Sequence, residues 1–109
     1  SQPQIVLQLL ARLLHSKQEP GDVIAAARWR FAGTNPSGFH TWANASDLVL
    51  QLEGHNTVDT KALKGLGHDI QYLGEYESAF GHAHLIDVQA NVLAGASDPR
   101  SLAGGVAGY

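Results

Sequence analysis

The sequence predicts an α+β fold in which helices come first and antiparallel strands follow. Two patterns support this prediction: an apolar stripe at helical spacing near the start, and short segments of alternating apolar and polar residues after residue 47. Of the 109 residues, 44% are hydrophobic and 16% are charged. That composition is sufficient for one hydrophobic core and argues against disorder. A single domain is therefore expected.

The first helix is expected at about residues 3–17. Six apolar residues repeat there at intervals of one and four and so form one stripe: Ile5, Val6, Leu9, Leu10, Leu13 and Leu14. Pro3 fits the first turn, because the backbone N–H that proline lacks has no helical partner there. The stripe needs a sheet to cover it, so residues 1–109 on their own are expected to expose apolar surface and to self-associate.

A second helix is expected from Pro20 to about Arg28. Asp22 would lie in its first turn, where a carboxylate interacts favourably with the helix dipole. The segment Arg28-Trp29-Arg30 is expected to form the solvated end of this helix, with Trp29 partly buried. Stacking of an arginine on the indole ring is the alternative for this segment.

The middle of the chain is expected to hold a turn, a strand and a short helix. Residues 33–38 have the glycine, asparagine and proline content of a turn. Residues 48–53 alternate in polarity and predict a strand that Gly54 ends. Thr57 is expected to cap the N-terminus of the short helix, and Gly67 to end it in a left-handed conformation.

Three more strands are expected towards the end, at residues 69–73, 85–88 and 92–94. Asn91 would form the tight turn between the last two, which predicts an antiparallel hairpin. The glycine-rich residues 102–109 are expected to stay flexible unless a surface holds them.

Composition and charge exclude several classes of function. The net charge of −3 comes from 7 basic and 10 acidic side chains without a basic run, so no nucleic-acid partner is expected. The apolar runs are far shorter than the ~20 residues of a membrane helix, so no membrane partner is expected either. The absence of cysteine excludes thiol nucleophiles and zinc–thiolate sites and leaves the cellular compartment unassigned.

The nucleophile and metal-ligand candidates are weak. Ser1 could attack with its own amine as base, but it leads into a predicted helix, whereas such nucleophiles open a strand. His82 and His84 would share one face of a strand and could hold a metal, but no third ligand is evident, so no metal is expected. Ser97, His84 and Asp87 could compose a triad, yet no nucleophile-elbow motif accompanies them.

The segment Asp98-Pro99-Arg100 is more informative. Pro99 restrains Asp98 to an extended conformation, and Arg100 can make two-pronged bonds to a carboxylate or to chain carbonyls. Arg100 could hold a substrate carboxylate, or it could fix the end of the chain to the body of the protein. We favour the second interpretation and expect Asp98 and Arg100 to be structural.

Six short motifs, in this order and at these spacings, resemble the C-terminal part of the small subunit of the γ-glutamyltranspeptidase family. They are Gln2-Pro-Gln4, Ala26-Ala-Arg-Trp29, Leu63-Lys-Gly-Leu-Gly-His68, Gly81-His-Ala-His84, Gly95-Ala-Ser-Asp-Pro-Arg100 and Gly108-Tyr109. One departure is Ala27, where relatives commonly have proline. The family's catalytic threonine segment and its paired oxyanion glycines would both precede Ser1, so no catalytic residue can be assigned here.

The resemblance implies a fold and a function. The fold would be part of an Ntn-hydrolase αββα sandwich, with residues 1–109 forming one partial domain. The parent enzyme would hydrolyse or transfer γ-glutamyl amides through an N-terminal threonine, without a metal or organic cofactor. This chain alone would be inactive, its partners being the large subunit and the N-terminal part of the small subunit. Ser1 and Gln2 would lie nearest the missing oxyanion glycines and could support them from behind.

Two alternatives stay open. The chain could be a standalone, non-catalytic binding domain of the same fold. It could also be part of a related acylase or amide hydrolase, because such enzymes share this C-terminal pattern.

Overall fold

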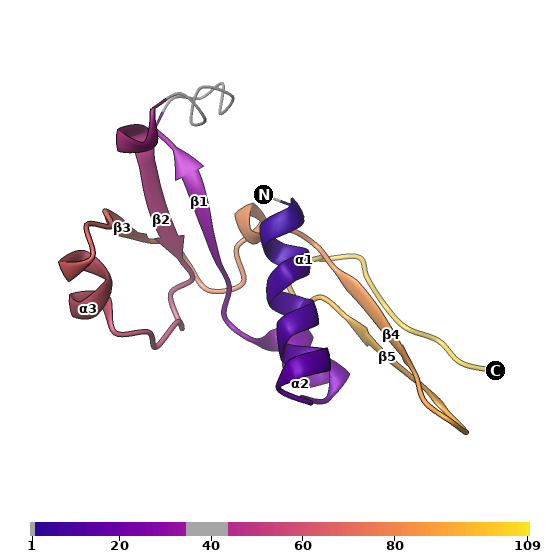
Figure 1. Cartoon of the computed structure of the whole chain (residues 1–109). Helices are drawn as coiled ribbons and strands as arrows, with labels where there is room; N and C mark the ends of the chain where they lie inside the picture. Colours follow the sequence, from indigo (N-terminus) through magenta and orange to yellow (C-terminus); the bar gives the residue numbers. More distant parts are fainter. Residues whose placement is uncertain (1, 35–43) are drawn as a thin grey trace.

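The computed structural model describes residues 2–34 and 44–109. Its helices and strands form small mixed sheets, which confirms the α+β part of the prediction. The molecule is elongated, with extents of 49 × 28 × 24 Å. A three-stranded sheet lies at one end, a two-stranded hairpin at the other, and the N-terminal helices lie between them (Figure 1).

The first helix agrees with the prediction. Helix α1 (Gln2–Leu10) continues into a π-helical turn, η1 (Ala11–His15), in which the N–H of Ser16 donates to the carbonyl of Ala11. Only Ile5 and Leu9 of the apolar stripe are buried. The outer part of the stripe is exposed, at Val6, Leu10 and Leu14. The chain therefore covers only half of the stripe itself.

The second helix is shorter than predicted. Helix α2 (Pro20–Ala25) stops at Ala26, whose backbone is extended, and strand β1 (Trp29–Gly33) follows. The prediction of a solvated helix end at residues 28–30 was wrong: Arg28 is buried, and the next two residues begin a strand. Pairing of β1 with a distant strand outweighs the helix propensity of the alanine run.

The three-stranded sheet has the order β1-β2-β3. Strand β2 (Leu48–Leu52) pairs antiparallel with β1 and parallel with β3 (Ile70–Tyr72). The positions of β2 and β3 confirm the strands predicted at 48–53 and 69–73. The parallel pairing corrects the prediction of antiparallel strands, because the β2–β3 connection carries a helix and is a crossover rather than a hairpin.

That crossover helix is α3 (Thr60–Gly65). Its N-cap is Asp59, whose Oδ1 accepts a hydrogen bond of 3.1 Å from the N–H of Ala62. The assignment of the cap to Thr57 was therefore wrong by two residues. Gly67 has φ +92° just past the helix, as predicted for a left-handed C-terminal residue. Of the predicted turn at 33–38, residues 35–38 lie outside the described part of the chain.

Two short 3₁₀ turns, η3 (Ala45–Asp47) and η4 (Ser78–Phe80), precede β2 and the hairpin. The predicted hairpin is confirmed: β4 (His84–Val88) pairs antiparallel with β5 (Leu93–Ser97). None of the described helices is long and apolar enough to cross a membrane.

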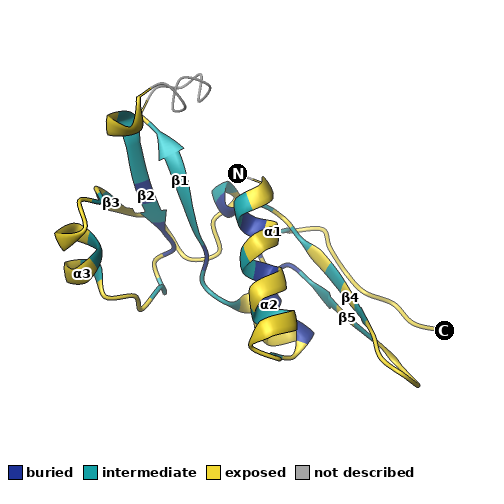
Figure 2. Ribbon diagram, viewed as in Figure 1, coloured by how far each residue is buried: buried dark blue, intermediate teal, exposed yellow. Residues whose placement is uncertain are grey.

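The main core lies where α1 and α2 pack on the hairpin. It consists of Ile5, Leu9, Val23 and Ile24, with Leu13, Ala83, Leu85 and Ala96 packed against it. Figure 2 shows the buried residues gathered at this junction, whereas the outward faces of α1 and of the hairpin are exposed.

Candidate functional site

Four charged side chains are buried at the junction of the two sheets. Their exposed fractions are 2% for Arg28, 0% for Glu53, 2% for Asp98 and 4% for Arg100. Arg28 follows α2, Glu53 follows β2, and the other two follow β5. Three chain segments far apart in sequence therefore meet in one cluster, which we call the buried charge network.

Arg100 is the centre of the network. Its Nε donates to Oε1 of Glu53 over 2.6 Å and its Nη2 to Oε2, a two-pronged pairing. Its Nη1 donates to Oδ1 of Asp98 over 3.0 Å. The same guanidinium also donates to the carbonyls of Ile24 and Ala26, over 2.9 Å and 3.0 Å. Arg100 thus joins the end of α2, the end of β2 and the segment after β5.

Arg28 completes the network from the other side. Its Nη2 lies 2.7 Å from Oδ2 of Asp98, and its Nη1 donates to the carbonyls of Phe80 and Gly81, each over 3.1 Å. Its backbone N–H donates to Oε2 of Glu53 over 2.7 Å. Within the described residues, Nε of Arg28 is the one network nitrogen without a hydrogen-bond partner. Nearly all of the hydrogen-bonding groups of these side chains have partners, either within the network or among nearby backbone groups.

The electrostatics of the network follow from its pairing. Burial raises the pKa of Asp98, but hydrogen bonds from the N–H groups of Arg100 and Ala83, together with the Arg28 cation, outweigh burial and hold this pKa below its ordinary value. Burial opposes the charge on Arg100, yet the bonds and charge of Glu53 raise its pKa. Burial and the neighbouring Arg100 cation lower the pKa of Arg28. Pairing with Asp98 acts to raise the pKa of Arg28, but burial and the like charge of Arg100 outweigh it.

An aromatic pair closes one side of the network. The Cζ of Arg100 lies 5.4 Å from the centre of the Tyr76 ring, and the His55 ring stacks on Tyr76 at 4.7 Å. Tyr76 has φ +52°, an unusual backbone for a non-glycine residue. The guanidinium of Arg100 is therefore enclosed by carboxylates, carbonyls and an aromatic face.

The charged groups of the network bond to one another and to the backbone, whereas those of a catalytic centre must be free to contact substrate. The carboxylates of Glu53 and Asp98 both accept hydrogen bonds from the Arg100 guanidinium. Sequence reasoning singled out Asp98 and Arg100 but missed Arg28 and Glu53. The available signal was Glu53 ending an apolar strand, directly before Gly54.

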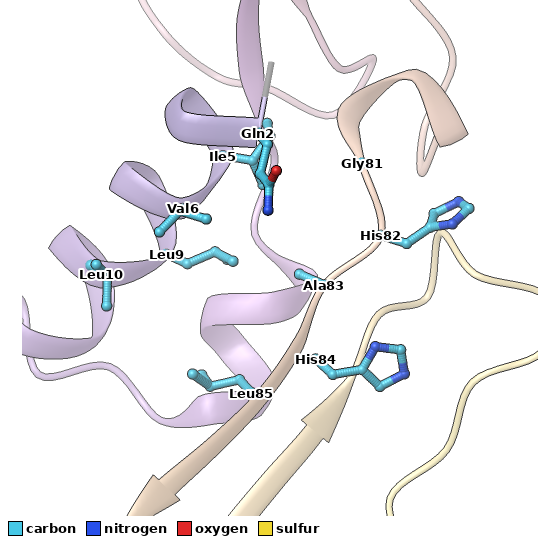
Figure 3. Close-up of a pocket in the computed structure, with 10 residues that line it drawn as sticks. All are labelled: Gln2, Ile5, Val6, Leu9, Leu10, Gly81, His82, Ala83, His84 and Leu85. Carbon is cyan, nitrogen blue, oxygen red and sulfur yellow. The ribbon is translucent and has the colours of Figure 1, made fainter.

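A cavity of about 510 Å³ lies between α1 and the start of β4 (Figure 3). Its walls are mostly apolar: Gln2, Ile5, Val6, Leu9, Leu10, Gly81, His82, Ala83, His84 and Leu85. We call it the α1–β4 groove. The side chain of Gln2 lies at one end of the groove, and the rings of His82 and His84 turn away from the helix. Ser1 lies outside the described residues.

The remaining predicted combinations do not form sites. His84 Nε2 lies 3.3 Å from Ser97 Oγ, but Asp87 bonds to Gln89 on the opposite face of β4. The triad of Ser97, His84 and Asp87 is therefore not assembled. Among the described residues, no three His, Cys, Asp or Glu side chains gather into a group that could hold a metal ion.

No family model matches the chain. Two curated proteins are similar along nearly all of it. The oxamate amidohydrolase proenzyme of Klebsiella pneumoniae is 36% identical over 99% of this chain, and the glutathione hydrolase-like YwrD proenzyme of Bacillus subtilis is 31% identical over 91%. The chain spans only 19% and 18% of these two proteins.

Two solved structures share the fold. The cephalosporin acylase of Bacillus halodurans has a TM-score of 0.67 and 30% identity, over 91% of this chain and 16% of that one. A γ-glutamyltranspeptidase of Pseudomonas nitroreducens, complexed with L-DON, has a TM-score of 0.65 and 18% identity, over 96% of this chain and 49% of that one. At the lower identity the likeness concerns the fold alone.

Proposed function

From the premise that the chain is a C-terminal portion of a γ-glutamyltranspeptidase-family protein, we propose that the whole protein hydrolyses or transfers γ-glutamyl amides. The observation that supports the proposal best is the similarity to the oxamate amidohydrolase and glutathione hydrolase-like proenzymes along nearly the whole chain, while those proteins are about five times longer. One relative is named an oxamate amidohydrolase and the other is named glutathione hydrolase-like. The choice of a γ-glutamyl substrate comes from the resemblance of the sequence motifs to those of the transpeptidases.

In this proposal the reaction takes place on polypeptide outside residues 1–109. An N-terminal threonine of the small subunit attacks the amide carbonyl, forming an acyl-enzyme and releasing the amine. Water or an acceptor amine then releases the γ-glutamyl group. Backbone N–H groups of paired glycines stabilise the oxyanion. Gln2 is the described residue nearest to that segment in sequence, and we assign it and Ser1 a supporting role behind those glycines.

The chain's own part in the proposal is to form one region of an αββα sandwich. The exposed half of α1 is apolar, as is the hairpin surface at Ile86, Val88 and Leu93, and we assign their covering to the rest of the small subunit and the large subunit. The buried charge network fixes α2, β2 and the segment after β5 to one another. Residues 1–109 would then act as one partial domain, with Asp98 and Arg100 as structural residues.

The test is a panel of amides offered to the complete protein. A γ-glutamyl anilide is compared with oxamate and with a cephalosporin-type acyl amide, and kcat/KM is measured for each. We expect the γ-glutamyl anilide to be preferred by about tenfold or more, because the γ-glutamyl carboxylate and amine give a site charged groups to bind. A variant with alanine at the N-terminal threonine of the small subunit is the control and should be inactive.

Two results would overturn the proposal. One is efficient turnover of oxamate or the acyl amide with none of the γ-glutamyl anilide, which would assign the chain to a different amide hydrolase. The other is hydrolysis by purified residues 1–109 alone, which would place the nucleophile within this chain.

A further inference from the structure

The last residues of the chain, 101–109, follow the hairpin without forming a helix or strand (Figure 1). We call them the tail. Arg100 is fixed in the buried charge network, so the tail leaves the body of the protein at a defined point. It then runs beside β4 and β5 rather than away from them.

The first specific contact joins Val106 to Gly95. Gly95 lies on β5, opposite Ile86 of β4, and both residues belong to the outward face of the hairpin. A Cβ built on Gly95 would lie 2.4 Å from Cγ1 of Val106, far inside van der Waals contact. The valine side chain therefore occupies space that any other residue at position 95 would fill.

The second specific contact places Gly104 on the pair formed by His84 and Ser97. These two residues face each other across the strands, with Nε2 and Oγ 3.3 Å apart. A Cβ built on Gly104 would lie 2.5 Å from Oγ of Ser97 and 3.0 Å from Nε2 of His84. The tail backbone thus approaches this pair as closely as a glycine allows.

The neighbouring glycines differ. A Cβ built on Gly105 or Gly108 would meet no atom within 4 Å. Among the glycines of the tail, Gly104 alone approaches the strands closely, and Val106 approaches the glycine of β5. The two contacts are two residues apart on the tail and two residues apart on β5, which matches an extended segment lying along the strand.

We propose that the tail is a strap bound in one register to the outward face of the hairpin. The acceptor surface consists of Gly95, His84 and Ser97, and its ligand is the chain's own Gly-Gly-Val segment at 104–106. A small residue fits over the His84–Ser97 pair and a branched apolar residue fits over Gly95. The strap contacts the half of the hairpin nearer the body, at His84, Gly95 and Ser97, whereas Ile86, Val88 and Leu93 are exposed.

Paired cysteines test the strap. The Cβ built on Gly95 lies 3.5 Å from Cβ of Val106, which is within the range for a disulfide, and the chain itself has no cysteine. The variant G95C/V106C is made in the complete protein and exposed to a mild oxidant, with G95C/G108C as the matched control and the single variants as baseline. Mass spectrometry of unreduced digests measures the link.

The strap predicts rapid formation of an intramolecular link in G95C/V106C, about tenfold faster than in G95C/G108C, because a bound segment has a high effective concentration at its site. Adding Gly104→Leu should slow the link strongly, and adding Gly105→Leu should not. Equal rates for the two cysteine pairs would overturn the proposal. So would a link between two molecules, which would show that the surface holds the tail of a second copy. None of these outcomes depends on enzymatic activity, so they are independent of the proposed function.

Discussion

The junction of the two sheets and the outward face of the hairpin depart in opposite ways from an ordinary small domain: the junction buries charges beside the apolar core, and the hairpin face exposes apolar side chains. The buried charge network places two arginines and two carboxylates at the junction of the sheets, each almost fully buried. The outward face of the hairpin carries Ile86, Val88 and Leu93, with exposed fractions of 63%, 77% and 67%. The charges are satisfied within the chain, but the apolar surface is not covered by it.

Substitutions in the two regions should therefore affect two different properties, the stability of the chain and its association with other polypeptide. Changes in the network should alter the free energy of unfolding, because each side chain there bonds only to other parts of the same chain. Changes on the hairpin face should alter association and leave unfolding almost unaffected. Variants in the two regions should therefore be distinguished by measuring unfolding and association side by side.

Arg100→Met should have the largest effect. It removes the partner of Glu53 and one partner of Asp98, leaving carboxylates buried with a single arginine. Breaking a buried ion pair in this way costs about 3–5 kcal/mol of unfolding free energy. The measurement is urea unfolding of the complete protein. Arg30→Met is the control: Arg30 bonds through Nε to Gln51 at a partly exposed position, and the expected loss is under about 1 kcal/mol. Equal losses would contradict the structural role of the network.

Acid should destabilise the protein through Asp98, by less than removal of Arg100 because protonation keeps the side chain in place. The pKa of Asp98 is lower in the folded protein than in the unfolded chain. Its contribution is therefore full above the unfolded pKa of about 3.9 and is lost as pH falls through the folded value. Urea midpoints between pH 7 and pH 2 should fall less steeply for Asp98→Asn than for the wild type.

The cap of α3 should contribute less. Asp59→Ala removes the acceptor of the Ala62 N–H and should cost about 1 kcal/mol. Thr57→Ala, two residues earlier, should cost almost nothing because Thr57 is exposed and does not cap the helix. Thermal unfolding of both variants checks the prediction. A larger loss of stability for Thr57→Ala than for Asp59→Ala would show that Thr57, the residue expected from the sequence, caps the helix.

The smallest effect on unfolding is expected on the hairpin face. Ile86→Thr combined with Val88→Thr keeps β-branched residues in the strand and should change the unfolding free energy by less than about 0.5 kcal/mol per residue. It should nevertheless reduce self-association and hydrophobic-dye binding of residues 1–109. Val23→Thr, in the core, should show the reverse: lower stability without a reduction in dye binding. If both variants changed stability and dye binding in the same direction, the core and the hairpin face would not play separate roles.

Periodicity predicted the elements whose packing is local. The stripe at Ile5 and Leu9, the alternation in β2 and the final hairpin all follow from residues close in sequence. Strand β1 was missed, because its partner β2 begins at Leu48 and the alanines before it favour a helix. The position of β1 depends on its pairing with β2, and no pattern of neighbouring residues reveals that pairing.

The network was half predictable for the same reason. Pro99 drew attention to Asp98 and Arg100 because it restrains the backbone between them. Arg28 has the ordinary sequence context of an exposed charge, and the only signal for Glu53 was its position at the end of an apolar strand. Their burial depends on the mutual approach of three segments, and only the folded arrangement shows it.

The most direct test of the account is sedimentation velocity of residues 1–109 purified alone, with hydrophobic-dye fluorescence on the same samples. The account predicts a folded chain that self-associates and binds dye, and loss of both properties when the chain is part of the complete protein. A clean monomer that binds no dye would contradict it, because such a chain would need no further polypeptide to cover its surface.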